Sequence, residues 1–215
     1  MEQSLKNQAY AYIKGKIISL EYKPNTIISE SALLKELDMS RTPVRESLIT
    51  LERENFVQIM PKRGILIKPI SITDVNMIYD SRLLIEPFLL KNYSNYIDLG
   101  ELRDCYEMMK KAEETGDSRD FFAIDDRFHR ILCMSGPNTY LTSALDHIYN
   151  QSQRIRILST PNVGERYSPA TAEHLKLCEA ILDHDIERAV QLLTEHLHTS
   201  KSIAISSLMN FSLPI

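Results

Sequence analysis

Residues 40–48 read Ser-Arg-Thr-Pro-Val-Arg-Glu-Ser-Leu, and this stretch decides the fold of the N-terminal part of the chain. It predicts a helix from about Arg41 to Glu54, because serine is a favoured N-cap and proline is tolerated in the first turn, where its missing N–H costs nothing. Arg41 and Arg45 lie four residues apart and therefore share one face of this helix. The opposite, buried face is expected to carry Val44, Leu48 and Leu51.

The elements expected around this helix form a known order. Apolar residues at helical spacing, from Ala9 to Leu20, predict an opening helix that ends near Glu21, before Pro24. Ser29 is expected to cap a second helix. Two β-prone runs, residues 56–59 and 65–67, flank the basic turn of residues 60–64 and predict a hairpin. Helix, helix, turn, helix and a two-stranded wing make a winged helix-turn-helix, which we assign to residues 1–70.

Length and composition exclude several classes of protein. A chain of 215 residues suggests two domains, and 43% hydrophobic with 25% charged residues is typical of a globular protein. The apolar runs are too short for a membrane span, and the first residues lack the apolar core of a secretion signal. Three cysteines without a close pair indicate a reducing compartment. We therefore expect a cytoplasmic protein with no membrane partner.

Charge indicates a polyanionic partner for the front domain. Residues 1–70 carry 11 Lys and Arg against 8 Asp and Glu, although the whole chain has a net charge of −4. The start of the third helix offers short polar groups and guanidinium groups that can reach base edges and phosphates, and arginine can bind guanine through two hydrogen bonds. We therefore expect double-stranded DNA as the partner of this domain.

The rest of the chain, residues 71–215, follows a short linker around Pro69 and shows helical patterning throughout. Turn-forming residues separate expected helices at about residues 73–94, 99–115, 118–134, 138–158, 168–183 and 186–208. No segment shows convincing strand alternation, so we expect an all-α bundle of six to seven helices with a sizeable core. The predicted fold class is therefore mainly α, with a winged helix-turn-helix in front of a helical bundle.

Histidine placement suggests a metal site inside this bundle. Asp125 and His129 are four residues apart and share a helical face, although such a pair alone is more often a surface pair. His174 and His196 are each 11 residues from Asp185, which lies in the turn between the last two helices, so the hairpin brings them level. One carboxylate and three imidazoles suit a divalent ion such as zinc, nickel or manganese.

Such a centre would attract an acidic ligand. Three neutral imidazoles and one carboxylate leave a divalent ion with a net charge of about +1 and open coordination positions, which favours a small carboxylate. Arg82, Arg154 and Arg156 are candidates for holding that ligand, because guanidinium groups match carboxylates with two hydrogen bonds. Arg154 and Arg156 are not expected to face inward together from one helix, and the sequence leaves open which of them does.

The front motif resembles the hallmark of the GntR superfamily of bacterial transcription regulators. Besides residues 40–48, the similar features are Leu51-Glu52, the Pro24 turn and the wing residues Lys62-Arg63-Gly64. The resemblance implies DNA contacts from Ser40, Arg41, Thr42, Arg45, Arg63 and Gly64. Asp38 and Asn55 stand where the family usually has glycine, and both residue types tolerate left-handed geometry. Ser31 stands where some members place a DNA-contacting arginine, so we expect that contact to be absent.

The back domain resembles, at scattered positions, the all-helical FCD effector domain of the FadR subfamily. Members of this branch often bind a metal through an Asp-x-x-x-His pair and two later histidines. In this chain the matching residues are Asp125, His129, His174 and His196. Arg82 and Glu86 match the Arg-x-x-x-Glu pattern that opens such domains, and we take both as ligand-binding residues.

The function predicted from the residues and the resemblance is a DNA-binding transcription regulator. We expect a repressor that binds a two-fold-symmetric operator as a homodimer and is controlled by a small organic acid at the metal. One alternative is a metal-dependent, hydrolase-like enzyme, but no carboxylate is placed as an obvious general base, since Glu173 is expected to point off the face of its neighbour His174. Another alternative is a regulator with a structural metal that senses a long-chain acyl ligand.

Overall fold

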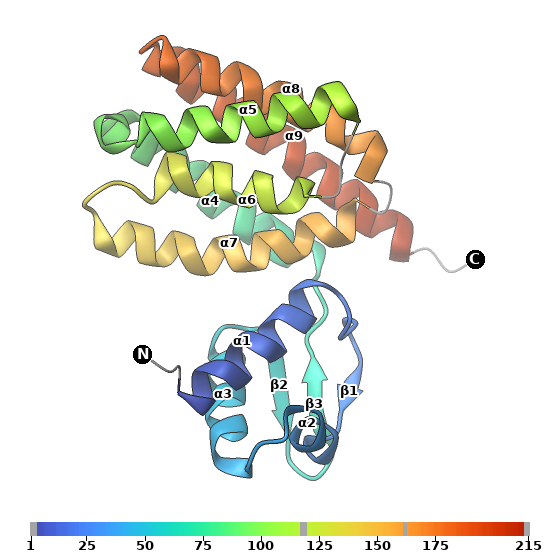
Figure 1. Cartoon of the computed structure of the whole chain (residues 1–215). Helices are drawn as coiled ribbons and strands as arrows, with labels where there is room; N and C mark the ends of the chain where they lie inside the picture. The colour runs from blue at the N-terminus through green and yellow to red at the C-terminus, as the bar shows by residue number, and fades with distance from the viewer. Residues whose placement is uncertain (1–3, 117–119, 161–162, 213–215) are drawn as a thin grey trace. The chain divides into compact units, whose positions relative to one another are not determined.

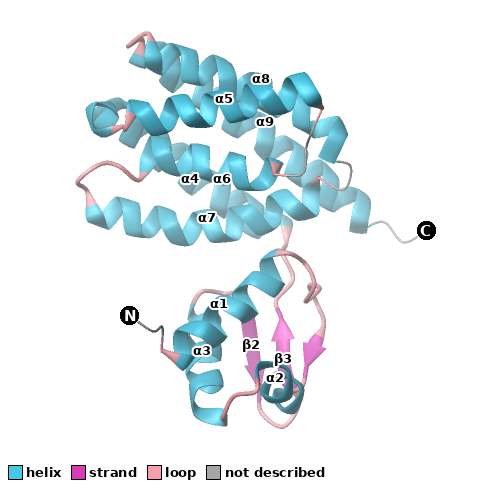
Figure 2. Cartoon of the chain, viewed as in Figure 1, coloured by secondary structure: helices cyan, strands magenta, loops and turns pink. Residues whose placement is uncertain are grey.

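The computed structural model describes residues 4–116, 120–160 and 163–212 (Figure 1). The chain divides into two compact units, Met1–Ser71 and Ile72–Ile215. Helices and a small sheet make up the first unit, whereas the described part of the second unit consists of helices and the loops that join them (Figure 2). This architecture confirms the predicted fold class, a winged helix-turn-helix followed by a helical bundle.

The N-terminal unit places three helices beside a three-stranded antiparallel sheet. Its elements are α1 (Leu5–Ile18), β1 (Ile27–Ile28), α2 (Glu30–Leu37), α3 (Arg41–Arg53), β2 (Val57–Met60) and β3 (Gly64–Ile67). Strand β3 lies in the middle of the sheet, between β1 and β2. The buried core between the helices and the sheet includes Ile13, Leu33, Val44, Leu48 and Leu51.

Short polar residues control the boundaries of α2 and α3. The Ser29 hydroxyl accepts a hydrogen bond from the Ala32 N–H at 3.1 Å, which caps α2 as expected. Asp38, with φ of 50°, ends that helix in the left-handed region, and Asn55, with φ of 62°, does the same shortly after α3. Ser40 occupies the N-cap position of α3, but its side chain makes no capping hydrogen bond, contrary to the expectation.

Two other features of this unit differ from the expectation. Helix α1 ends at Ile18, and Leu20, expected within that helix, has a φ of 62° that no helix continues through. Strand β1 was not expected, and it pairs with β3 through Ile27 opposite Leu66. Gly64 opens β3 with a φ of 113°, and a Cβ atom at this position would lie 2.7 Å from the Ile28 carbonyl oxygen. Only glycine therefore fits beside β1 at this point of the wing.

The C-terminal unit is a bundle whose helices enclose one large apolar core. Its helices are α4 (Ile72–Tyr93), α5 (Leu99–Thr115), α6 (Phe121–Cys133), α7 (Thr139–Ser159), α8 (Val163–Leu182) and α9 (Ile186–Ser212), with a 3-10 turn, η1 (Ser94–Tyr96), after α4. Helix α4 packs along α9 and α7, and α5 packs along α8 (Figure 1). Cys105, Cys133 and Cys178 are buried in this core as free thiols. Within the described residues, no helix combines the length and apolarity that a membrane crossing requires.

Two helices of the bundle contain a proline. Helix α8 begins at Val163 and contains Pro169, whereas we expected this helix to start at about residue 168. Pro87 likewise lies within α4. The start of the third bundle helix was expected at residue 118, which lies outside the described residues, and α6 is described from Phe121.

Candidate metal centre and nucleic-acid interface

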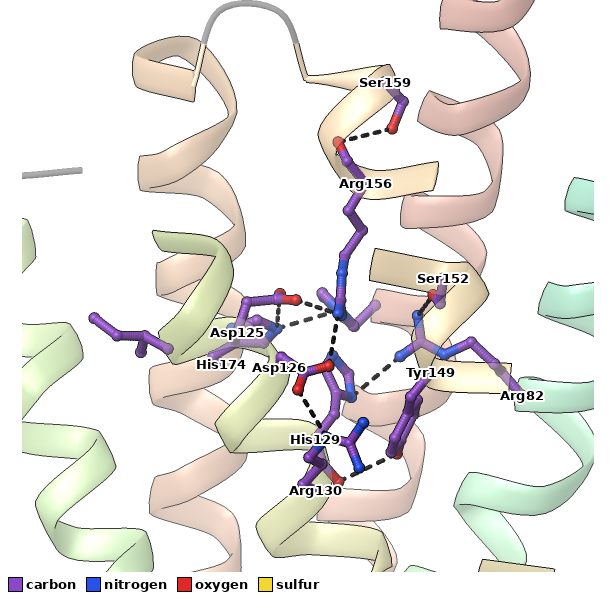
Figure 3. Close-up of polar contacts among 12 residues, drawn as sticks. Arg82, Asp125, Asp126, His129, Arg130, Tyr149, Ser152, Arg156, Ser159 and His174 are labelled. Atoms are coloured by element: carbon purple, nitrogen blue, oxygen red, sulfur yellow. Dashed lines mark hydrogen bonds and ion pairs between the residues drawn. The ribbon is translucent and has the colours of Figure 1, made fainter. Parts of the chain in front are cut away.

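Four side chains from three helices meet in the interior of the C-terminal unit. Helix α6 supplies Asp125 and His129 from one face, α8 supplies His174, and α9 supplies His196. One possible ligand atom from each residue lies within 4.8 Å of the others, and all four residues are buried. The four residues that the sequence selected by spacing are therefore neighbours in space, and Figure 3 shows three of them, Asp125, His129 and His174.

Some polar atoms of this cluster have close polar neighbours, and one imidazole nitrogen has no hydrogen-bond partner. His174 Nε2 lies 3.2 Å from His196 Nε2 and 3.6 Å from Asp125 Oδ1. His129 Nε2 is buried and has no hydrogen-bond partner. Burial lowers the pKa of His129 and of His174 well below the usual 6.5, so both imidazoles are neutral at pH 7. A buried nitrogen without a partner, next to neutral imidazoles and a carboxylate, fits a site for a divalent ion.

Arg156 lies against the cluster from α7. Its Nη1 pairs with Asp125 Oδ2, and its Nη2 donates to Asp126 Oδ1 at 3.2 Å (Figure 3). Burial alone would raise the pKa of Asp125, but Arg156 and the three histidines together lower it by more and hold that pKa below its usual range. The same guanidinium group thus stabilises a carboxylate that a metal ion would also use. Asp126 was not identified from the sequence, because only its contact with another helix distinguishes it from an ordinary surface acid.

Both candidate arginines on α7 are buried, contrary to the expectation that only one could face inward. Arg154 does not belong to the four-residue cluster and is not among the described residues that line the cavity beside it. Burial lowers its pKa to about 10, and the charge of Asp74 on α4 opposes this shift. Helix α7 packs against both α4 and α9, so two of its sides are covered. Of the two arginines, the structure places Arg156 at the cluster.

Arg82 and Glu86, which we expected to bind the ligand, form a buried ion pair behind His129. Arg82 Nε donates to Glu86 Oε1 at 2.5 Å, and Arg82 Nη1 donates to Ser152 Oγ at 2.9 Å. His129 Nδ1 lies 3.2 Å from Arg82 Nη2 (Figure 3). The same nitrogen lies 3.1 Å from Glu86 Oε2. Both side chains are at most 1% exposed. The i, i+4 spacing on α4 allows these two side chains to pair with each other.

A small cavity lies beside the cluster. It has a volume of about 30 Å³ and is lined by residues from several helices, including Tyr79, Asp125, Arg156, Ser159 and His196. This volume is close to that of one water molecule. A long acyl chain does not fit in it, and a small carboxylate fits only if neighbouring side chains move.

Sequence reasoning missed a second carboxylate at the cluster. Glu173 Oε2 lies 2.6 Å from His196 Nδ1. From the sequence, Glu173 was compared only with its neighbour His174 on the same helix. Its hydrogen-bond partner is His196 on α9. The sequence does show a carboxylate directly before a predicted ligand histidine. Which histidine this carboxylate contacts depends on how α8 and α9 pack.

The N-terminal unit exposes most of the residues expected to contact DNA. Ser40, Arg41, Thr42 and Arg45, at the start of α3, and Arg63, in the wing turn, are exposed, and Gly64 is half-buried. A groove of about 500 Å³ runs between α3 and the wing and includes Arg45, Arg63 and Gly64 among its lining residues. Three of the six expected residues therefore line one groove, whose charged lining also includes Lys62 and Glu30.

Glu30, at the start of α2, pairs with two of the arginines of α3, Arg41 and Arg45. Arg45 donates from Nε and Nη2 to the two Glu30 carboxylate oxygens at 2.9 and 3.1 Å. Arg41 Nε lies 3.2 Å from the same carboxylate. The side chains of Arg41 and Arg45 are 67% and 57% exposed, so they remain accessible to solvent. This shared carboxylate was not identified from the sequence.

Two families and several known proteins are similar to this chain. Residues 5–67 match the bacterial regulatory proteins of the gntR family, and residues 77–199 match the FCD domain. The HTH-type transcriptional repressor RspR of Escherichia coli (strain K12) is 25% identical over 201 residues, which cover 91% of this chain and 86% of the repressor. A GntR transcriptional regulator from Rhodococcus sp. RHA1 has a similar fold, with a TM-score of 0.82, 18% identity and coverage of 95% of this chain and 99% of that one.

A further solved structure resembles the C-terminal unit. It is the FCD domain of TM0439, known in a metal-free and a Zn²⁺-bound form. These two forms have TM-scores of 0.59 and 0.56 and identities of 26% and 27% to this chain. Each comparison covers 66% of this chain and 99% of that domain.

Proposed function

Because the chain belongs to the GntR family of bacterial regulatory proteins and carries an FCD domain, we propose that it is a metal-dependent repressor of the FadR subfamily. The families and relatives indicate a transcription regulator and not an enzyme. In the proposed function, the winged head binds an operator and the FCD domain binds a divalent ion and a small organic acid. The name of the similar protein RspR supports repression over activation.

The DNA-binding part of the proposal rests on exposed residues at the start of α3 and in the wing. We assign base and phosphate contacts to Ser40, Arg41, Thr42, Arg45, Arg63 and Gly64. A single recognition helix contacts only a few base pairs, so useful specificity requires two heads. We therefore propose a homodimer on an operator with two inverted half-sites.

The metal part of the proposal rests on one observation: four potential ligand atoms lie within 4.8 Å of one another, and one of the imidazoles has a buried nitrogen without a partner. Asp125, His129, His174 and His196 would hold the ion, with zinc, nickel or manganese as candidates for this mixed nitrogen and oxygen set. When bound, the ion supplies positive charge and open coordination positions for an acidic ligand. The Zn²⁺-bound form of a similar FCD domain supports zinc among these candidates.

The effector part of the proposal assigns the carboxylate of the ligand to Arg156. Its guanidinium group lines the cavity beside the histidines and now pairs with Asp125. Because the cavity has only about 30 Å³, a carboxylate can enter only if Arg156 moves away from Asp125. A small acid therefore fits this site better than a long-chain acyl ligand. In this proposal the dimer has two arrangements, which differ in the spacing of its DNA-binding heads. The effect of the ligand on operator binding can be no larger than the difference in its affinity for these two arrangements.

Elemental analysis of the purified protein tests the metal site. The unmutated protein should contain about one divalent ion per chain after incubation with zinc and dialysis, and His196→Ala should lose most of it. His198→Ala is the matched control, because His198 lies on the same helix but is exposed. A protein that takes up no metal, or a His196→Ala variant that keeps as much as His198→Ala, contradicts the proposal.

A thermal-shift screen tests the effector. The probes are small mono- and dicarboxylates, each measured with and without a chelator, because a ligand that binds only the native state raises its stability. Acids that raise the melting temperature only in the absence of chelator support a carboxylate bound at the metal. Equal shifts with chelator would place the ligand elsewhere.

A further inference from the structure

The contact between Glu173 and His196 determines which nitrogen of His196 carries hydrogen. Glu173 Oε2 lies 2.6 Å from His196 Nδ1, a distance at which a hydrogen atom must lie between the two. An ionised carboxylate only accepts hydrogen bonds, and a neutral imidazole has one N–H and one lone pair. His196 therefore donates from Nδ1 to Glu173. In the neutral form of His196, the form that can coordinate a metal, the lone pair is then at Nε2.

This arrangement leaves Nε2 of His196 ready to bind a metal. Nε2 lies inside the cluster, 3.2 Å from Nε2 of His174. Two lone pairs facing each other at this distance would repel, so His174 must donate and His196 must accept. The donor role of His174 follows from the contact that Glu173 makes on the other side of His196. In the metal-free protein, His196 is thus already in the tautomer that coordinates through Nε2.

His129 has no equally selective partner. Its Nδ1 lies 3.1 Å from the acceptor Glu86 and 3.2 Å from the donor Arg82, so the two contacts favour opposite tautomers. The Glu86 carboxylate is also paired with Arg82, which offsets its negative charge. By comparison, the contact between Glu173 and His196 is short, and in it His196 can only donate and Glu173 can only accept. This difference singles out Glu173 among the carboxylates behind the histidines.

We propose that Glu173 is a positioning residue of the metal centre, which fixes the tautomer and orientation of His196 and thereby sets the affinity for the ion. The inference rests on the proposed metal site and adds a residue that does not itself touch the ion. Carboxylates that accept from the outer nitrogen of a ligand histidine raise the basicity of that ligand, and losing one typically lowers metal affinity 10–100-fold.

Metal titration of the full chain tests this role. Zinc affinity is measured by competition with a chromophoric chelator, and Co²⁺ absorption spectra report the ligand field. Glu173→Ala should lower zinc affinity 10–100-fold and alter the Co²⁺ spectrum. Glu173→Gln keeps a neutral acceptor and should lie between Glu173→Ala and the unmutated protein. Glu195→Gln is the matched control, because Glu195 also precedes a ligand histidine but is exposed and accepts from Gln191 at 2.8 Å.

The outcomes separate this inference from the proposed function. If the unmutated protein binds no zinc, the metal site itself is wrong. If it binds zinc, but Glu173→Ala binds equally well or Glu195→Gln loses as much affinity, the role of Glu173 is wrong. Glu173 is partly exposed, so we expect its variants to fold, and the far-UV circular dichroism of the metal-free proteins checks this.

Nitrogen-15 NMR of the metal-free protein tests the tautomer without any metal. His196 should show the chemical shifts of an imidazole protonated at Nδ1, and Glu173→Ala should shift the population toward the form protonated at Nε2. A His196 that is protonated at Nε2 in the unmutated protein, or whose tautomer is unchanged in Glu173→Ala, would overturn the proposal.

Discussion

Replacing Arg82 with methionine should destabilise the C-terminal unit by about 3–4 kcal/mol at pH 7. Methionine fills much of the space of the arginine stem but leaves the carboxylate of Glu86 without its ion-pair partner. Both side chains are at most 1% exposed, so water cannot replace the lost hydrogen bonds. The expected effect therefore comes from a buried carboxylate that keeps only its contact with His129, and not from lost packing.

The chemistry of a carboxyl group limits this loss. A buried carboxylate that becomes too costly takes up a proton, and protonating an ordinary glutamate with a pKa of about 4.3 costs about 3.7 kcal/mol at pH 7. Each pH unit below 7 reduces that cost by about 1.4 kcal/mol. The destabilisation caused by Arg82→Met should therefore become smaller as the pH falls from 7 to 5. Lost packing alone would give a penalty that does not depend on pH in this way.

Urea unfolding followed by circular dichroism at 222 nm measures this effect, because the chain has no tryptophan. Arg82→Met combined with Glu86→Leu should recover most of the loss, since a buried ion pair can often be replaced by apolar residues. Arg154→Met is the matched control, because it removes another buried arginine from the same unit without leaving Glu86 unpaired. A loss below about 1 kcal/mol, or a double variant no more stable than the single one, refutes the reasoning.

Three further predictions concern DNA, assembly and pH. Arg41→Ala and Arg45→Ala should each weaken operator binding by about 1–3 kcal/mol with unchanged helical content, and unaltered gel shifts in both variants would contradict the assigned recognition helix. Sedimentation should show a dimer at micromolar concentration and footprints should show two inverted half-sites; a monomer that stays monomeric on DNA would exclude this assembly. Because burial lowers the pKa of His129 and His174, the unfolded metal-free chain binds more protons than the folded one below pH 6.5. Its stability should therefore be constant on this account above pH 6.5 and fall by up to about 2.7 kcal/mol per pH unit below it, which urea unfolding at pH 5.5 and 7.5 can measure.

Local signals predicted the N-terminal fold well. Ser29 caps α2 and Asp38 ends it because both effects depend on neighbouring residues. Strand β1 was missed because two residues, Ile27 and Ile28, are too few to show alternation, and the strand exists only through its pairing with β3. Ser40 shows the limit of a sequence motif, since it stands at the N-cap without making the capping hydrogen bond.

In the candidate metal centre, too, the positions of the ligands were predicted and their contacts with other helices were not. Spacing about a turn placed His174 and His196 level, and their Nε2 atoms lie 3.2 Å apart. The sequence does not show what stands behind each ligand, because those contacts join different helices. Glu173 on α8 contacts His196 on α9, and Arg82 pairs with Glu86 on its own helix. Distance along the chain predicts which residues can share a face, but packing decides which atoms meet.

A carboxylate shared by two arginines also changes how the DNA-binding head should respond to ionic strength. Glu30, Arg41 and Arg45 together carry a net charge of +1, although two guanidinium groups are exposed. When a protein neutralises a DNA phosphate, condensed cations are released. Each such phosphate steepens the plot of log binding constant against log salt concentration by about 0.9. By its net charge, this cluster of Glu30, Arg41 and Arg45 should neutralise one phosphate and not two. Operator binding should therefore weaken less with rising salt than the number of arginines on the recognition helix suggests.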